Sequence, residues 1–214
     1  KCDIILCARD YYEQSEESIE SLSVKVSRIE IISAKDFQKV QSTVSSQGIV
    51  GVFEKKTKLT FKSFNGDLII ALENLNDPGN VGTIMRNTDW FGINEMLLSK
   101  NCADIFNPKT IRASSGSIFH LKTISDAKLI DELTSFKMNG YTILCADITG
   151  TNIYEYQKNK KEIIVFSNEA NGPTNELLQL ADERVTVPKK GKAESLNVAS
   201  ASAVILSELT KTNK

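Results

Sequence analysis

Apolar runs of four to six residues alternate along the chain with longer stretches in which apolar residues recur at helical spacing. This alternation predicts an α/β protein, because short apolar runs are typical of strands and helical spacing is typical of amphipathic helices. The predicted strands cover residues 4–8, 29–32, 48–53, 68–72, 95–98, 119–123, 141–146, 163–166 and 184–187. The predicted helices cover residues 13–22, 33–40, 83–91, 108–113, 125–140, 173–181 and the chain from 194 onward.

The strands after residue 67 lack the alternation of apolar and polar residues that marks a half-exposed sheet. Residues 68–72, for example, read Leu-Ile-Ile-Ala-Leu. Continuous runs of this kind are typical of parallel strands buried on both faces, so the sequence predicts a parallel sheet flanked by helices. The Gly-x-Gly-x-x-Gly turn of dinucleotide-binding Rossmann folds does not follow the first of these strands, which argues against ordinary Rossmann methyltransferases and dehydrogenases.

A polar stretch at residues 55–67, which contains the turn signal Asn65-Gly66, is the best candidate for a linker. We therefore expect a small α/β domain at 1–62 and a larger α/β domain at 63–214. The chain enters directly in a predicted strand, and we expect that an N-terminal element of the small domain is missing from this numbering.

Composition is that of a globular protein, with 41% hydrophobic and 25% charged residues. No apolar stretch approaches the roughly 20 residues needed to span a bilayer, so no membrane partner is expected. The four cysteines form no Cys-x-x-Cys pair, which favours reduced thiols, a cytoplasmic protein and no metal site. The single histidine, His120, has apolar neighbours and is expected to be structural rather than catalytic.

The net charge of −1 argues against a nucleic-acid partner, since such proteins usually carry a basic excess. Lysines nevertheless cluster at three places: 55–62, 158–161 and 189–192. Solvated surface lysines are the simpler interpretation of the second cluster. The third cluster, Lys189, Lys190 and Lys192, lies in a loop that is expected to line the site.

Three loops rich in Gly, Pro and Asn each follow an apolar run and lead into a predicted helix. They are residues 76–87, 166–172 and 187–198. Loops at the ends of strands carry the binding and catalytic groups of many α/β proteins. Within the first loop, Gly82 would allow a neighbouring backbone to approach closely. Arg86 has apolar neighbours and needs an anionic partner, for which spacing alone favours a salt bridge to Asp89 or Glu73.

Taken in order, the three loops resemble the motifs of the SpoU (TrmH-like) family of RNA ribose 2′-O-methyltransferases, in the SPOUT superfamily. The resemblance implies S-adenosylmethionine as cofactor, a C-terminal trefoil knot that holds it, and a homodimer in which two protomers build each active site. Residues 36–52 resemble, more weakly, the end of an L30e-like domain. That resemblance implies that 1–62 is part of an RNA substrate-binding domain and 63–214 the catalytic domain.

The resemblance also implies which residues form the site. It implies a catalytic group made of Arg86, Asn80, Glu169, Ser195 and Asn197. It implies cofactor contacts, largely through the backbone, by Ser167, Asn168, Gly172, Val187, Pro188, Gly191 and Leu196. Two positions depart from the family pattern: Ser167 stands where the family has Gly, and Lys189 where it usually has Met. A positive φ at Ser167 would be costly.

The expected activity is methyl transfer to a ribose 2′-OH of RNA, with ribosomal RNA favoured over transfer RNA. Two alternatives stay open. A related knotted enzyme could methylate a base, although Asn80 with Arg86 argues against it. A non-catalytic RNA-binding descendant of the family is the second alternative, although the intact polar residues of the motifs argue against lost chemistry.

Overall fold

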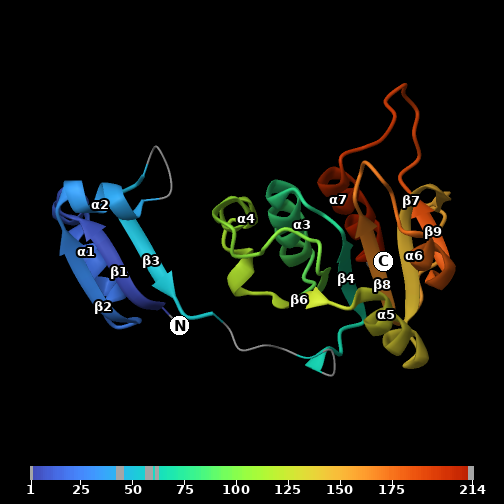
Figure 1. Ribbon diagram of the computed structural model, residues 1–214, viewed down its shortest axis with the longest axis horizontal. Coiled ribbons are helices and arrows are strands. Elements are labelled where there is room, and N and C mark those ends of the chain that lie inside the picture. The colour runs from blue at the N-terminus through green and yellow to red at the C-terminus, as the bar shows by residue number, and fades with distance from the viewer. Residues whose placement is uncertain (1, 42–45, 56–59, 61–62, 212–214) are drawn as a thin grey trace. The chain divides into compact units, whose positions relative to one another are not determined.

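The computed structural model describes residues 2–41, 46–55, 60 and 63–211. Contacts along the chain divide it into two compact units, Lys1–Thr57 and Lys58–Lys214 (Figure 1). Each unit is described by itself. Part of the predicted linker, and with it Lys56, Lys58 and Lys62 of the first lysine cluster, lies outside the described residues.

The N-terminal unit is a three-stranded sheet in the order β2-β1-β3, with β1 and β2 parallel and β1 and β3 antiparallel. Its elements are β1 (Cys2–Ala8), α1 (Arg9–Leu22), β2 (Val26–Ile32), α2 (Ala34–Val40) and β3 (Ile49–Phe53). Ser33 caps α2 by accepting a hydrogen bond from the backbone N–H of Asp36. The buried residues Ile5, Cys7, Ile19 and Phe37 form the core.

The C-terminal unit is a six-stranded sheet in the order β6-β5-β4-β8-β7-β9, in which every pairing is parallel. This confirms the predicted α/β class. Its elements are β4 (Leu68–Glu73), α3 (Pro78–Trp90), β5 (Glu95–Ser99), α4 (Pro108–Ser114), the 3-10 helix η2 (Ser117–Phe119), β6 (Lys122–Ala127), α5 (Leu129–Met138), β7 (Thr142–Asn152), β8 (Glu162–Ser167), α6 (Asn175–Leu180), β9 (Glu183–Thr186) and α7 (Val198–Leu209).

Helices cover both faces of this sheet, as the continuous apolar strands predicted. Ile70 and Leu72 of β4 pack into a core that also contains residues of α3 and α7. Ile69 and Ala71 point to the other face and pack with residues of α5 and α6. Successive side chains of a strand point to opposite faces, so one strand contributes to both cores.

Several predicted boundaries were wrong. The predicted strand at 119–123 is displaced, because 117–119 form η2 and the strand runs over Lys122–Ala127, where it pairs with β5. That pairing delays the helix predicted from Ser125 until Leu129. The last helix begins at Val198 and not at Glu194, and α3 begins at Pro78, before the predicted residue 83.

A buried carboxylate ties the end of the predicted linker to the sheet. Glu95, at the start of β5, is 1% exposed and accepts hydrogen bonds from the backbone N–H groups of Asn65 (3.1 Å) and Gly66 (2.8 Å). The hydroxyl of Tyr141 donates to the carbonyl of Gly66 (3.0 Å). The C-terminal unit therefore holds the chain firmly from Asn65 onward.

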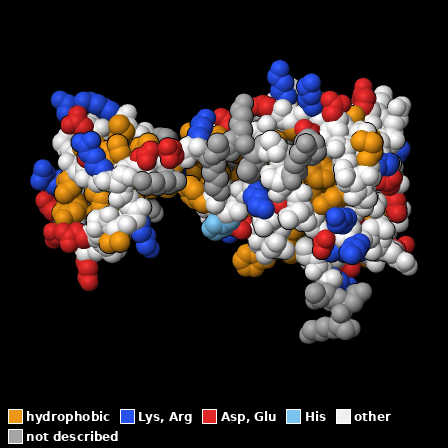
Figure 2. Space-filling view, turned by 90° about the horizontal axis from the view of Figure 1, so that it is seen from below, with side chains coloured by type: hydrophobic (Ala, Val, Ile, Leu, Met, Phe, Trp, Pro, Cys, Tyr) orange, Lys and Arg blue, Asp and Glu red, His pale blue; other side chains and the backbone are white. Residues whose placement is uncertain are grey.

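Across the described ranges, none of the helices combines the length and apolar character required to cross a membrane. All four cysteines are free thiols. The part of the chain that the structure describes holds no group of three or more His, Cys, Asp or Glu side chains placed to bind a metal ion. On the face drawn in Figure 2, acidic and basic side chains are interspersed over the larger unit, in keeping with the near-zero net charge.

Candidate active site

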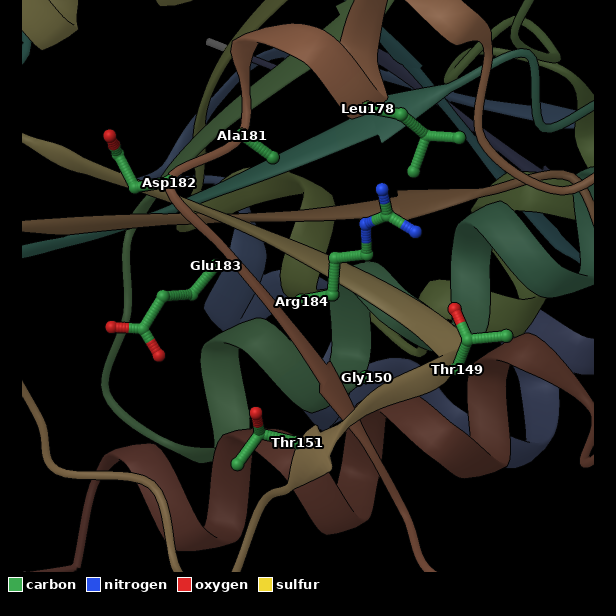
Figure 3. Close-up of a pocket in the computed structure, with 8 residues that line it drawn as sticks. All are labelled: Thr149, Gly150, Thr151, Leu178, Ala181, Asp182, Glu183 and Arg184. Carbon is green, nitrogen blue, oxygen red and sulfur yellow. The ribbon is translucent and has the colours of Figure 1, made fainter.

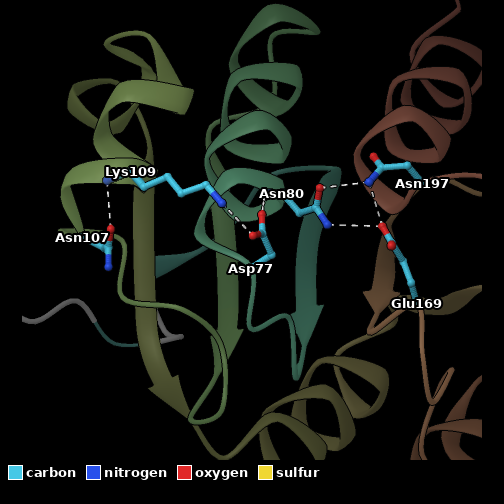
Figure 4. A network of polar contacts seen from close by, with 6 residues as sticks. All are labelled: Asp77, Asn80, Asn107, Lys109, Glu169 and Asn197. Atoms are coloured by element: carbon cyan, nitrogen blue, oxygen red, sulfur yellow. Dashed lines mark hydrogen bonds and ion pairs between the residues drawn. The ribbon is translucent and has the colours of Figure 1, made fainter. Parts of the chain in front are cut away.

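The three loops singled out in the sequence meet at the carboxylate of Glu169 (Figure 4). Its Oε1 accepts hydrogen bonds from the side-chain amide of Asn80 (3.2 Å), the side-chain amide of Asn197 (2.9 Å) and the backbone N–H of Val198 (2.6 Å). The amide of Asn197 also donates to Oδ1 of Asn80 (3.1 Å). One residue from each loop thus forms a closed network, which places three of the five predicted catalytic residues together.

Asn80 is held by the way α3 begins. Asp77 is the N-cap, Pro78 takes the first helical position, and the Asp77 carboxylate accepts from the backbone N–H of Asn80 (2.8 Å). Nζ of Lys109 lies 2.8 Å from the other carboxylate oxygen of Asp77. The hydrogen bond from Lys109, followed by that from Asn80, lowers the pKa of Asp77, so this cap is negatively charged at neutral pH.

Asn197 is fixed as the N-cap of α7. Its Oδ1 accepts from the backbone N–H groups of Ala199 (3.0 Å) and Ser200 (3.2 Å), which leaves its Nδ2 to donate to Asn80 and Glu169. The carboxylate of Glu169 therefore lies against the N-terminus of α7, where the helix dipole favours a negative charge. Capping by Asn197 is also the reason that the helix begins later than Glu194.

Asn87 extends the network along the two helices, and sequence reasoning missed its role. Its Nδ2 donates to the carbonyl of Ala199 (2.9 Å) and to Oγ of Ser202 (2.9 Å). Asn87 follows Asn80 by seven residues, two helical turns, so both side chains lie on the face of α3 that meets α7. That spacing was the signal that could have identified it.

Gly82 provides the close approach that the sequence predicted, but to α4. A Cβ at Gly82 would lie 2.6 Å from Cβ of Ala113 and 3.0 Å from the backbone nitrogen of Ser114. No side chain fits there, so the glycine allows α4 to pack directly on α3. This packing brings Lys109 within reach of Asp77.

A second carboxylate, Glu73, orders the loop after β8. It is 4% exposed and accepts from Oγ of Ser167 (2.9 Å), Oγ1 of Thr174 (2.6 Å) and the backbone N–H of Thr174 (3.1 Å). Ser167 lies within β8 without a positive φ, so the strain considered for this position does not arise. Its side chain is engaged by Glu73, which leaves its backbone for any contact with a ligand.

Asn168 and Gly172 line a pocket at the carboxyl ends of the central strands β4 and β8. The other lining residues are Asn74, Asn171, Pro173, Thr174 and Asn175. Asn168 donates from its side chain to the carbonyl of Asn74 (3.1 Å) and accepts at its backbone carbonyl from Gly172 N–H (2.8 Å). Gly172 has φ of +65° and nothing within 4 Å of where a Cβ would stand, so its backbone is open to approach.

The loop between β9 and α7 carries the remaining predicted residues. Val187 and Pro188 are half-buried, whereas Gly191, Ser195 and Leu196 are exposed. Ser195 makes no hydrogen bond with any residue in the described ranges, so it stands apart from the Glu169 network. Gly191 does not adopt a left-handed φ, and a Cβ there would meet nothing within 4 Å.

Arg86 is exposed on α3 and lies outside the network. The salt bridge favoured by spacing alone was wrong, because Asp89 pairs with Nδ1 of His120 (2.9 Å) and Glu73 is occupied by Ser167 and Thr174. Among the described residues Arg86 has no ion pair or hydrogen-bond partner. Six positions along a helix correspond to about 240° of rotation, so Arg86 and Asn80 leave α3 in different directions.

A second depression, lined by residues of β7, α6 and β9, contains none of the predicted site residues (Figure 3). Arg184 lies there, with its NH1 3.7 Å from Oδ2 of Asp147. Asp182 is engaged by Lys137 (2.7 Å) and by the backbone N–H of Ile143 (2.8 Å). Of the charged side chains that line this depression, Arg184 and Asp182 therefore already have partners, and Glu183 is the exception.

Comparison with known proteins identifies relatives along almost the whole chain. The chain is 30% identical over 181 residues to the 23S rRNA (guanosine(2553)-2′-O)-methyltransferase of Bacillus subtilis, covering 84% of this chain and 71% of that protein. It is 30% identical over 179 residues to an uncharacterized tRNA/rRNA methyltransferase of Synechocystis, covering 83% of this chain. The chain spans 65%, about two thirds, of the length of that relative.

Solved structures show the same fold. A TrmH-family protein from Porphyromonas gingivalis superimposes with a TM-score of 0.82 at 28% identity, covering 97% of this chain and 82% of that chain. The SpoU methyltransferase AviRb of Streptomyces viridochromogenes, solved with S-adenosylmethionine, superimposes with a TM-score of 0.84 at 22% identity, covering 98% and 82%. The model of the SpoU rRNA Methylase family matches residues 67–207, and the chain belongs to that family.

Proposed function

We propose that this protein transfers a methyl group from S-adenosylmethionine to a ribose 2′-hydroxyl of RNA. The observation that carries the proposal is the hydrogen-bond network at Glu169, which unites Asn80, Asn197 and the start of α7. These residues come from the three loops whose order resembles the family motifs. Family membership supports the activity.

The residues at the carboxyl ends of the strands fit such a cofactor. The pocket beside Asn168 and Gly172 is open and offers backbone groups, and Gly172 lacks the Cβ that would obstruct them. Leu196, 49% exposed, and the half-buried Val187 provide apolar contacts from the neighbouring loop. Asn168, Gly172, Val187, Pro188, Gly191, Leu196 and the backbone of Ser167 would hold it. When bound, S-adenosylmethionine supplies an electrophilic methyl group on a sulfonium.

In the proposed reaction the ribose 2′-oxygen forms a bond to the methyl carbon while the sulfur–carbon bond breaks. The 2′-hydroxyl proton passes to solvent, and S-adenosylhomocysteine is released. The protein contributes mainly alignment of the two reactants. Glu169 acts as a positioning residue, because its Oε1 is occupied by three donors that orient Asn80 and Asn197. Ser195, exposed at the same loop, contacts substrate rather than the network.

Arg86 is proposed to bind the RNA and to stabilise the developing negative charge on the 2′-oxygen. A guanidinium has a pKa above about 12 and does not readily act as a base, whereas its planar fork binds a phosphate through two hydrogen bonds. Arg86 is exposed and has no partner among the described residues, which leaves it available to an anion.

A homodimer is part of the proposal. Arg86 projects from α3 away from the Asn80 network, and Trp90, one turn further along, is 80% exposed. An exposed Trp beside an unpaired Arg fits a surface that a second copy covers. In the proposed dimer, Arg86 of one protomer serves the site of its partner, which accords with the implication of the resemblance that two protomers build each active site.

Ribosomal RNA is the favoured substrate over transfer RNA. The Bacillus subtilis relative is named as a 23S rRNA enzyme, and residues 36–52 resemble part of an L30e-like domain. We propose that residues 1–62 bind structured RNA and that 63–214 catalyse the transfer, in the cytoplasm.

The test uses labelled S-adenosylmethionine and total RNA from cells that lack this protein, with wild type beside Arg86→Ala. Nuclease digestion of the product separates methylated ribose from methylated base. Label in ribose of one RNA, lost in the variant, would support the proposal. Label in a base would refute it, and RNA binding without cofactor binding would point to a non-catalytic protein.

A further inference from the structure

We propose that three lysines, Lys189, Lys190 and Lys192, bind phosphates of the substrate RNA next to the methyl-transfer site. The segment that carries them, residues 187–197, is termed the lysine loop. The inference rests on the proposed function, because it assigns a substrate contact to that site. It concerns a segment in which this chain departs from the family pattern, with Lys189 at a place usually given to Met.

The three lysines are exposed and carry no ion pair with any residue that the structure describes. Three other lysines of the same unit differ in this respect. Lys109, Lys122 and Lys137 each lie within 3.2 Å of a carboxylate oxygen. Charges already engaged in this way have less to gain from a phosphate. The lysine loop therefore holds cations that are free to bind an external anion.

The two ends of the loop are anchored at the sheet and at the site. At one end Thr186 is the last residue of β9, and its carbonyl accepts from the backbone N–H of Ile153 (2.9 Å). At the other end Asn197 is bonded to Asn80 and Glu169. Both ends of the lysine loop are thus held at the edge of the sheet where the strands end, and Figure 1 draws the orange-red segment between β9 and α7 as a loop that extends outward from that edge.

The local charge is positive. Residues 187–197 contain three lysines and one acid, Glu194, a net charge of +2. The acid of the neighbouring network, Glu169, keeps its negative charge, and its Oε1 accepts hydrogen bonds from Asn80, Asn197 and the backbone N–H of Val198. A polyanion is the ligand that such a loop fits, because each phosphate bound to a lysine releases a condensed counterion. Contacts of this kind position the nucleic acid without reading its sequence.

The chain supplies an internal control in Lys158 and Lys160. Both are exposed and unpaired within the described ranges, as are the three lysines of the lysine loop. They precede Glu162, the first residue of β8, and so lie at the opposite edge of the sheet from the site. Replacing either pair by alanine changes the net charge from −1 to −3. Any difference between the two variants therefore reflects position and not total charge.

The experiment measures binding of the full chain to a mixed-sequence RNA hairpin over a range of salt concentrations, for wild type, Lys189→Ala/Lys190→Ala and Lys158→Ala/Lys160→Ala. Two lost phosphate contacts should reduce the slope of log affinity against log salt by about 1.4–1.8. Between 50 and 200 mM salt, the affinity of wild type for the hairpin should therefore fall by roughly tenfold more than that of Lys189→Ala/Lys190→Ala. The control pair should retain the wild-type slope.

A Lys189→Arg/Lys190→Arg variant should restore the slope, because it restores the charge. Equal slopes for wild type and Lys189→Ala/Lys190→Ala would overturn the inference while leaving methyl transfer by the wild type, and hence the proposed function, intact. Equal losses in both alanine variants would also overturn it, since they would show an effect of net charge. A wild type that neither binds nor methylates RNA would refute the proposed function itself.

Discussion

The side-chain amide of Asn197 donates to Oδ1 of Asn80 across 3.1 Å, although 117 positions separate the two residues in the chain. Each asparagine also donates to Oε1 of Glu169. Asn80 lies in the first turn of α3 and Asn197 caps α7, so this contact fixes the starts of two helices against each other. The arrangement makes the geometry of the site dependent on a few polar atoms.

Replacing Glu169 with Gln should reduce methyl transfer roughly a hundredfold, the order of magnitude lost when a reacting group is displaced by about 1 Å. An amide oxygen is a weaker acceptor than a carboxylate for the three donors that converge on Oε1. The single-turnover rate with saturating RNA and cofactor measures the effect. Glu176→Gln, an exposed acid on α6, is the matched control and should retain the wild-type rate. Equal rates for both variants would contradict a positioning role.

Substitutions at Asn197 should separate its two roles. Asn197→Ser keeps an oxygen that can cap α7 but loses the amide that donates to Asn80 and Glu169, so stability should be retained while activity falls. Asn197→Ala loses both, and should also cost about 0.5–2 kcal/mol of unfolding free energy. Urea unfolding and methyl-transfer rates measured on the same samples provide the test. Full activity of Asn197→Ser would show that the amide contacts are dispensable.

The conservative change Arg86→Lys should leave RNA methylation strongly impaired. Lysine keeps the positive charge but lacks the planar fork that binds a phosphate through two hydrogen bonds. The measurement compares kcat and KM for wild type, Arg86→Lys and Arg86→Ala. Wild-type activity in Arg86→Lys would exclude two-point anchoring and leave only a charge effect.

Gly82→Ala should destabilise the C-terminal unit by about 1–3 kcal/mol, the usual cost of forcing extra atoms into a packed core. The added Cβ would stand 2.6 Å from Cβ of Ala113, so α4 would have to move away from α3. Gly191→Ala is the control for stability, because a Cβ there meets nothing within 4 Å. Equal unfolding midpoints for the two variants would disprove the close helix contact.

The cap at Asp77 should make stability depend on pH in the acidic range. Its pKa is lowered below the ordinary value of 3.8 by Lys109 and by the N–H of Asn80. Because the pKa of Asp77 is lowered in the folded state, the carboxylate contributes fully to the free energy of unfolding above pH 3.8, the ordinary pKa. This contribution is lost as pH falls through the lowered pKa. Asp77→Asn retains a capping oxygen without the charge and should lose this part of the acid dependence. Urea midpoints between pH 2 and 7 measure it, and parallel curves for the two proteins would contradict it.

Local patterns predicted β4, β5 and β8 of the C-terminal unit well, because these strands are buried on both faces. The boundaries of helices and strands were harder to predict where two sequence signals compete. Ser125 and Asp126 read as the start of a helix, yet pairing with β5 extends the strand through Asp126, which adopts φ of +58°. Likewise Glu194 and Ser195 suit a helix start, but Asn197 provides the cap.

Local sequence patterns could not predict the contacts that build the site. Asn80 and Glu169 are 89 positions apart, and Glu73 and Thr174 are 101 apart, so only the folded sheet brings them together. The resemblance to a family identified Asn80, Glu169 and Asn197 without saying that they bond to one another. Spacing on α3 could have added Asn87, whereas no local signal links Lys109 to Asp77.

The central claim is that this chain methylates one or a few ribose 2′-hydroxyls of RNA. The most direct test maps ribose methylation at nucleotide resolution in ribosomal and transfer RNA from cells without the protein, and from the same cells supplied with wild type or Glu169→Ala. We predict that at least one ribose methyl group, in ribosomal RNA, is absent without the protein and restored only by the wild type. Identical ribose methylation in all samples would contradict the claim.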